Sequence, residues 1–114
     1  MDNEPELCYK KDVDEDQQKY VRMAAAISGN DLDFLATVNQ ENGLWTPDRI
    51  HNDGYGRGFC GFDTRWWNHI INDERFLTDP HWQLEQCYEK YVGGTRFYGF
   101  DVRHKSKPLF VCPE

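Results

Sequence analysis

Glu41 is the residue whose type and position best suit acid–base chemistry in this sequence. It lies in the last turn of a predicted helix, where a carboxylate opposes the helix dipole at a cost of about 0.3–1 kcal/mol, so helix stability does not explain it. Val38 and Trp45 flank it and can exclude water from the carboxyl group. Because desolvation raises the pKa of a carboxyl group, Glu41 is a candidate general acid, and the alternative is a solvated surface side chain.

Asp53 and Asp63 are the candidates for a second carboxylate. Asp53 lies in the turn Asn52-Asp53-Gly54, where an aspartate side chain commonly bonds the local backbone. Asp63 precedes a predicted helix and equally suits its N-cap. Each aspartate therefore has a structural and a catalytic interpretation, and the sequence leaves both open.

Aromatic side chains near these carboxylates offer binding surfaces. Trp45 either stacks on a ligand ring or fills the core beside the helix that carries Glu41. Tyr91 either directs its hydroxyl group at the site or holds it in water at the edge of the core. The other tryptophans, Trp66, Trp67 and Trp82, lie at helical positions. We expect at least two of these three in the core.

The cysteines and histidines lack metal-ligand spacing, so we expect no bound metal and no cofactor. Four cysteines in a small aromatic-rich domain favour two disulfides and an oxidising compartment: secreted, periplasmic or cell-surface. Three pairings are possible, and we favour Cys8 with Cys112 and Cys60 with Cys87, which would anchor the N-terminal arm. No signal peptide follows Met1.

The length and charge of the chain exclude several functions. The 114 residues suit one domain, and the net charge of −7 argues against a footprint on nucleic-acid phosphates. No apolar run approaches the about 20 residues that cross a bilayer, which excludes a membrane span in this sequence.

Helical periodicity predicts two helices around Glu41. Residues 14–28 form the first, which stops at Gly29, and the second begins after a cap at Asn30 or Asp31 and has Glu41 in its last turn. Each follows Asp or Asn residues that suit N-caps. Gly43 suits the left-handed position after the second helix. These helices must present the carboxyl group of Glu41.

Turn chemistry dominates the segment that follows. Residues 46–61 are rich in Gly, Pro and Asn-Asp-Gly signals and predict a long structured loop or a short hairpin. Asp63 begins a predicted third helix that carries Ile71, and Asp79-Pro80 opens a fourth that Gly93-Gly94 closes. Residues 95–111 predict an extended tail with one weak hairpin or helical turn.

Three motifs together resemble the lysozyme-like lytic transglycosylases, the superfamily of soluble lytic transglycosylases and goose-type lysozymes. Residues 34–43, FLATVNQENG, are similar to the family's helix that ends in a catalytic Glu followed by Ser or Asn and Gly. Residues 56–62, GRGFCGF, resemble its Gly-x-x-Gly-Leu-x-Gln segment, and residues 91–94, YVGG, its Tyr-Asn-x-Gly. Gly61 stands where the family usually has Gln, and Val92 where it has Asn.

The resemblance, over roughly residues 24–100, implies a fold and a set of site residues. The fold is mainly α: a small lysozyme-like catalytic domain over residues 14–114, with a Gly-rich active-site loop or short hairpin and an extended C-terminal segment, after an arm over residues 1–13. Glu41 matches the catalytic acid, and the glycines Gly58 and Gly94 also match. The expected substrate-binding residues are Trp45, Gly58, Phe59 and Tyr91.

The implied activity is cleavage of the β-1,4 bond between N-acetylmuramic acid and N-acetylglucosamine in peptidoglycan glycan strands. In a transglycosylase, Glu41 first donates a proton and then deprotonates the muramic acid 6-hydroxyl group, so no second carboxylate is needed. An inverting hydrolase needs a base about 6.5–9.5 Å away, for which Asp53 or Asp63 is available. Such domains are often parts of larger cell-wall hydrolases or of secretion or phage assemblies.

Two other functions remain open at this point. A noncatalytic glycan-binding module on the same fold is favoured if Glu41 is fully exposed or paired with Arg57. A disulfide-stapled helical interaction domain is favoured if the second helix runs unbroken through Asn42-Gly43 and leaves no cleft.

Overall fold

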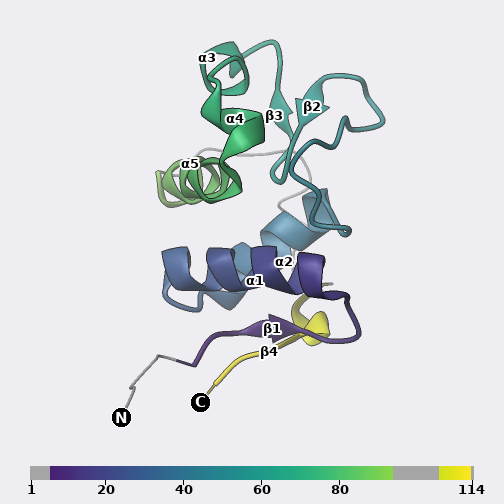
Figure 1. Ribbon diagram of the computed structural model, residues 1–114, viewed down its shortest axis with the longest axis vertical. Helices are drawn as coiled ribbons and strands as arrows, with labels where there is room; N and C mark the ends of the chain where they lie inside the picture. The colour runs from purple at the N-terminus through teal and green to yellow at the C-terminus, as the bar shows by residue number, and fades with distance from the viewer. Residues whose placement is uncertain (1–5, 94–105, 114) are drawn as a thin grey trace.

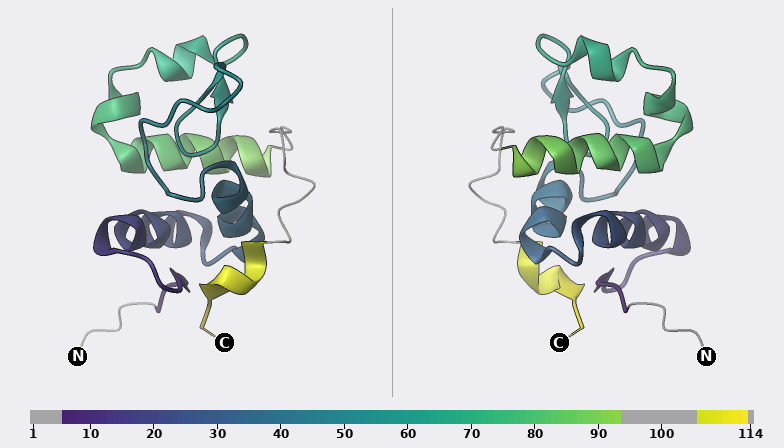
Figure 2. Two further views of the ribbon diagram at one scale, coloured as in Figure 1. Left: turned by 90° about the vertical axis from the view of Figure 1, so that its right-hand side faces the viewer. Right: turned by 90° about the vertical axis from the view of Figure 1, so that its left-hand side faces the viewer.

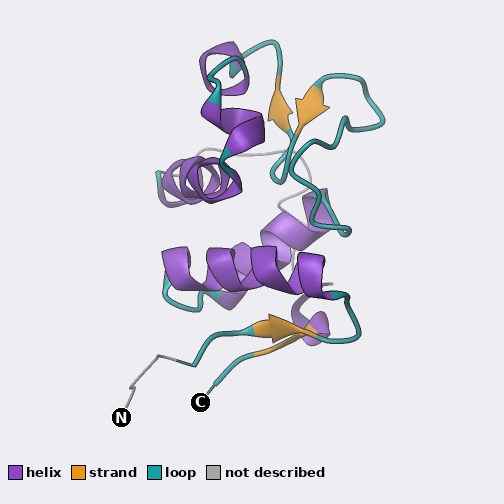
Figure 3. Ribbon diagram, in the orientation of Figure 1, coloured by secondary structure: helices purple, strands orange, loops and turns teal. Residues whose placement is uncertain are grey.

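Helices and two small antiparallel sheets form the chain in the computed structural model, which describes residues 6–93 and 106–113 (Figure 1). Figure 3 shows how helix dominates these residues, as the sequence predicts. The helices are α1 (Glu15–Ser28), α2 (Leu32–Glu41), α3 (Asn68–Ile71), α4 (Arg75–Thr78) and α5 (Pro80–Val92). The sheets pair β1 (Tyr9–Lys10) with β4 (Phe110–Val111), and β2 (Gly56–Arg57) with β3 (Phe62–Asp63).

The first two helices begin where their capping residues predict. The Asp14 carboxylate accepts the backbone N–H of Gln17 at 2.8 Å, and Gly29 ends α1 in the left-handed conformation with φ of 65°. The Asp31 carboxylate accepts the N–H of Phe34 at 3.1 Å and begins α2. Both bonds satisfy N–H groups that have no partner within the helix.

The prediction of a left-handed Gly43 is wrong. Asn42 is the C-cap of helix α2 and has φ of −149°, and Trp45 is the residue after the helix with a positive φ, 54°. The reason is the fully buried side chain of Asn42, whose amide donates to the Thr46 carbonyl at 2.7 Å. This bond turns the chain without a glycine C-cap.

The predicted third helix is also wrong in its first half. Asp63 lies in β3 opposite Gly56 rather than at a helix N-cap, and the helix begins only at Asn68. Cross-strand pairing and a turn at Asp63, whose carbonyl accepts the N–H groups of Trp66 and Trp67, replace it. Helix α4 follows as a second short helix that the sequence pattern does not predict.

Helix α5 matches its predicted start and end. The Asp79 carboxylate accepts the N–H of Trp82 at 3.0 Å, Pro80 lies in the first turn, and Gly93 follows the last helical residue. Gly94 and most of the predicted tail lie outside the described residues. Residues 106–109 form the predicted helical turn before β4.

The core lies between α1, α2 and α5, and it continues under the β2–β3 hairpin. Figures 1 and 2 both show α1 and α2 between the β1–β4 sheet and the part formed by the hairpin, α3 and α4. Trp67 and Trp82 pack partly buried against this core, whereas Trp66 is 62% exposed. The fully buried side chains include Val21, Leu35, Val38, Phe59, Phe62, Leu84 and Cys87. No helix within residues 6–93 or 106–113 has the length and apolarity of a membrane span.

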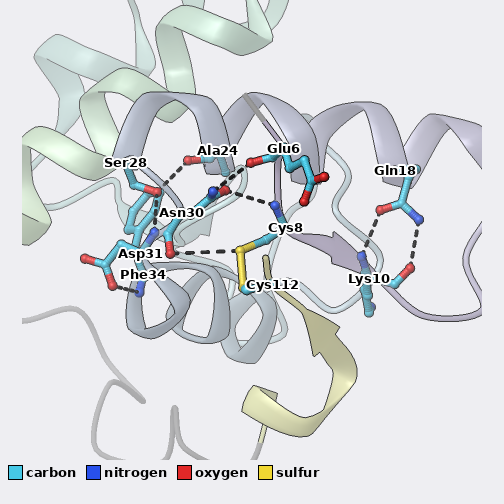
Figure 4. Close-up of a disulfide and its surroundings, with 10 residues drawn as sticks. All are labelled: Glu6, Cys8, Lys10, Gln18, Ala24, Ser28, Asn30, Asp31, Phe34 and Cys112. Carbon is cyan, nitrogen blue, oxygen red and sulfur yellow. Dashed lines mark hydrogen bonds between the residues drawn. A yellow bond between two sulfur atoms is a disulfide. The ribbon is translucent and has the colours of Figure 1, made fainter. Parts of the chain in front are cut away.

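Both predicted disulfides are confirmed: Cys8 with Cys112, and Cys60 with Cys87. Figure 4 shows the first of them beside Asn30, whose side chain accepts the N–H of Cys8 at 2.9 Å and donates to the carbonyl of Glu6. The N-terminal arm is therefore fixed to the domain through a disulfide, the β1–β4 pairing and hydrogen bonds.

Candidate functional site

Glu41 is the last residue of α2, and its half-buried carboxyl group faces the turn between β2 and β3. A methyl group added to Gly61 would lie 3.0 Å from Oε1 of Glu41 and 3.2 Å from the His51 ring. Gly61 has φ of 65°, which a residue with a side chain rarely adopts. The turn therefore approaches the carboxyl group and the imidazole ring closely, and a side chain at this position would crowd both.

Burial sets the acidity of Glu41. Loss of water around the carboxyl group raises its pKa to about 7, although the nearby positive charge of Arg49 lowers the pKa and the negative charge of Asp53 raises it further. Arg49 also donates to the backbone carbonyl of Glu41 at 3.3 Å. At neutral pH the carboxyl group is thus present in both protonated and ionised forms, as a residue that donates and regains a proton requires.

The turn opposite Glu41 is tied directly to the end of α2. The Gly58 carbonyl accepts the amide of Asn42 at 3.2 Å, and Nε2 of His51 lies 3.0 Å from the same oxygen. Because a carbonyl oxygen only accepts, Nε2 carries the hydrogen in this bond. The side chains of Asn42 and His51 thus fix the position of the turn.

Helix α5 holds the same turn from the other side. The Gln83 side chain is fully buried, and its Oε1 accepts the N–H of Phe59 at 2.7 Å. Its amide donates to the carbonyls of Pro47 at 3.0 Å and Phe76 at 2.8 Å. The disulfide from Cys60 to α5 adds a covalent link. The turn is therefore rigid where it faces Glu41.

Gly58 has a structural explanation for its residue type. It adopts φ of 77°, and an added methyl group would lie 2.2 Å from Oε1 of Gln83. Any side chain at this position would displace the turn from Gln83. This close approach accounts for the glycine without a sugar contact.

The two candidate second carboxylates are both engaged. Asp53 is exposed and accepts the N–H groups of Tyr55 at 2.8 Å and Gly56 at 3.0 Å, which lower its pKa. Asp63 forms two hydrogen bonds with the Arg65 guanidinium, at 3.0 and 2.8 Å, and these lower its pKa. Both carboxylates are ionised at neutral pH, and each accepts hydrogen bonds within its own turn.

Trp45 and Phe59 belong to the core, and the expected sugar contacts at these residues are wrong. Trp45 is 1% exposed, and its indole N–H donates to Asn39 Oδ1 at 2.9 Å. Phe59 is fully buried, with its ring edge-on to Tyr20. Neither ring offers a face on which a sugar can stack.

Tyr91 lies at the other end of α2. Its ring packs on Phe34, 5.3 Å between centroids, and on Tyr88. Phe34 is in the first turn of α2, and Glu41 ends this helix about 10 Å further along. These contacts do not bring Tyr91 next to Glu41, whereas the side chain of Asp53 is close enough for its charge to act there.

The residues that position the site were not singled out in the sequence: Asn42, Arg49, His51 and Gln83. Gln83 does carry a signal, because it is a polar residue between Trp82 and Leu84 on a helix that must bury one face. Asn42 directly follows the acid. His51 and Arg49 lie in a loop with no periodicity, so nothing local predicts their contacts.

Within residues 6–93 and 106–113, no three His, Cys, Asp or Glu side chains are grouped as a metal site requires. No protein-family model matches the chain, and neither a curated protein nor a solved structure is significantly similar to it.

Proposed function

We propose that the chain is a lysozyme-like glycosidase that cleaves the β-1,4 bond between N-acetylmuramic acid and N-acetylglucosamine in peptidoglycan, with Glu41 as general acid and base. One observation carries the proposal: a desolvated carboxyl group with a pKa of about 7 ends α2 and lies close to the glycine-containing turn of the β2–β3 hairpin. Two disulfides fit the oxidising surroundings in which peptidoglycan lies, and we propose a secreted, periplasmic or cell-surface location.

The geometry suits proton transfer to a glycosidic oxygen. The protonated form of Glu41 donates to the leaving oxygen, and positive charge develops on the sugar ring. The carboxylate that results lies in surroundings that disfavour its charge, so it readily takes up a proton again. Gly61 lets the turn lie close to the acid.

The state of the other carboxylates favours the transglycosylase mechanism. An inverting hydrolase needs a base that activates water. Asp53 and Asp63 instead bond backbone N–H groups and Arg65, and a lowered pKa makes each a weak base. Glu41 alone suffices when its carboxylate deprotonates the 6-hydroxyl group of the muramic acid, which closes a 1,6-anhydro ring.

The described residues lack the features that would favour the two other candidate functions, a glycan-binding module and a helical interaction domain. Glu41 is half-buried, and Arg57 donates to the carbonyls of Gly54 and Gly56. Helix α2 stops before Asn42-Gly43. A noncatalytic glycan-binding module and a helical interaction domain therefore have less support than an enzyme.

Digestion of purified peptidoglycan with the wild-type chain, followed by mass spectrometry of the released muropeptides, tests the proposal. We expect anhydro ends. Glu41→Gln should reduce clearance of cell-wall turbidity by about 10²–10⁴-fold, because an amide has no acidic proton to donate. Asp53→Asn is the matched control and should reduce clearance only mildly.

Three other results have distinct meanings. Reducing ends, with an Asp53→Asn loss as large as that of Glu41→Gln, would establish an inverting hydrolase instead. A folded Glu41→Gln protein with wild-type clearance would remove the catalytic role of Glu41. No release of muropeptides by the wild-type chain would contradict the enzyme assignment.

A further inference from the structure

An exposed aromatic patch lies at the open end of the β2–β3 hairpin. Trp66 is 62% exposed and Tyr55 is 43% exposed. The Arg65 guanidinium lies between them, 3.9 Å from the centre of the Tyr55 ring and 4.7 Å from that of Trp66. We call these three residues the aromatic shelf. None of them belongs to the core.

Hydrogen bonds to Asp63 and to the hairpin backbone hold the aromatic shelf in place. Asp63 fixes Arg65 through two side-chain hydrogen bonds and also accepts its backbone N–H at 2.8 Å. The N–H of Thr64 donates to the carbonyl of Tyr55 at 3.0 Å and extends the hairpin pairing by one step. Large exposed rings that are pre-positioned by an ion pair bind a flat ligand at little cost in side-chain entropy.

The same hairpin connects the shelf to Glu41. Its turn carries Gly61 against the acid, and its two strands lead away to Tyr55 on one side and Arg65 on the other. Gly61 and Thr64 are three residues apart, about 10 Å of extended chain. The shelf and the acid thus lie at two places along one hairpin, so a polymer that passes along the hairpin could contact both.

Charge decides which polymer fits. The Asp63 carboxylate offsets the Arg65 cation, so the shelf offers two ring faces and little net charge. A nucleic-acid strand needs neutralising cations along its phosphates, and a chain of net charge −7 with this paired arginine is poorly suited to it. The carbon–hydrogen face of a pyranose is uncharged and stacks on indole and phenol rings.

We propose that the aromatic shelf of Tyr55, Arg65 and Trp66 is a subsite that stacks on a sugar ring of the glycan strand, away from the bond that is cleaved. This proposal rests on the function proposed above. It adds that the protein binds strands longer than the disaccharide at the cleaved bond, because the sugar on the shelf is a further one.

Binding of β-1,4-linked N-acetylglucosamine oligomers by calorimetry tests the shelf, in Glu41→Gln protein so that nothing is cleaved. Trp66→Ala should weaken binding of a hexamer about tenfold and leave binding of a dimer within about twofold. Trp66→Phe should restore most of the hexamer affinity. Leu77→Ala, which removes an equally exposed apolar side chain from α4, is the control and should change neither.

The possible failures are distinguishable. Equal hexamer binding with and without Trp66 overturns the shelf, and the proposed function stands if the wild-type chain still cleaves peptidoglycan. If the Glu41→Gln protein binds no oligomer and the wild-type chain releases no muropeptide, both proposals are wrong. Binding of a single-stranded oligonucleotide, lost in Trp66→Ala, would replace the sugar with a nucleic-acid base.

Discussion

The carboxyl group of Glu41 shows how position outweighs residue type. Glutamate ordinarily titrates near 4.5, and the positive charge of Arg49 acts to lower that value, yet burial raises the pKa to about 7. The same burial makes the ionised side chain unfavourable for folding. Functional sites often contain an ionisable group whose pKa is shifted by its surroundings, and the shift lowers the stability of the fold.

The pH dependence of stability follows from this shift. Between pH 4.5 and 7 the folded protein keeps a proton that the unfolded chain releases, so the free energy of unfolding falls as pH rises through this range. Glu41→Gln removes the titration. We expect the variant to exceed the wild type by about 1–3 kcal/mol at pH 8 and to equal it at pH 4, measured by urea denaturation. The same difference at both pH values would contradict the raised pKa.

His51 is expected to act as a positioning residue. His51→Ala deletes the bond to the Gly58 carbonyl that fixes the turn opposite Glu41, and we expect kcat for peptidoglycan to fall about tenfold with little change in KM. His51→Gln retains an N–H donor at a similar reach and should restore most of kcat. His81→Ala, on the exposed side of α5, is the control. If Gln fails to restore kcat while the fold is intact, the imidazole ring itself is required.

At the scale of single residues, the sequence predicted the placement of the acid but not its partners. Glu41 and the local bonds of Asp53 follow from nearby residues, because helix ends and turns are short-range features. Trp45 and Tyr91 do not, because whether a ring is buried depends on elements far along the chain. The contact of His51 with Gly58 likewise depends on how the loop folds back.

At the scale of elements, Gln83 joins three segments that lie apart in the sequence. One buried side chain satisfies the N–H of Phe59 and the carbonyls of Pro47 and Phe76. Helix α5 thereby holds the hairpin turn, the loop that follows α2 and helix α4 in one arrangement. The disulfide between the same helix and Cys60 acts beside it.

Gln83→Leu should therefore destabilise the protein severely. The substitution keeps the volume but leaves three backbone groups without their partners, each at a cost of about 1–3 kcal/mol when buried. We expect the free energy of unfolding to fall by at least about 3 kcal/mol in thermal or urea denaturation. Gln86→Leu, one turn further along the same helix and half-buried, should change it by less than about 0.5 kcal/mol. Similar losses in both variants would mean that helix α5 tolerates no leucine.

The elements that local signals determine were predicted, and those that pairing determines were not. Helices α1, α2 and α5 were predicted because their own sequences contain an N-cap residue and an apolar stripe. The segment from Asp63 has the same kind of signals, but strand pairing between Gly56 and Asp63 replaces its first helical turn. A competing contact from another segment is the physical reason why propensity fails there.

At the scale of the molecule, the two disulfides should have different consequences. Replacing either pair by serines removes about 2–5 kcal/mol of stability, because each bridge restricts the unfolded chain. Only the Cys60 and Cys87 pair also fixes the turn at Glu41. Activity is compared at a temperature well below the melting temperatures of both variants. There we expect replacement of Cys60 and Cys87 to reduce peptidoglycan cleavage, whereas replacement of Cys8 and Cys112 leaves cleavage unchanged. Equal losses of activity would show that the Cys60–Cys87 bridge has no specific effect on the site.

The bridge between Cys8 and Cys112 also gives the domain a mechanical property. The two α-carbons are 4.1 Å apart although 104 positions separate them in sequence. A pull applied through segments on either side of the bridge passes across a single sulfur–sulfur bond and bypasses every helix between. While the Cys8–Cys112 bridge is oxidised, such a force does not extend the part of the domain between the two cysteines. Once reduced, the β1–β4 pairing, with two strand residues on each side, is the first structure to carry that load.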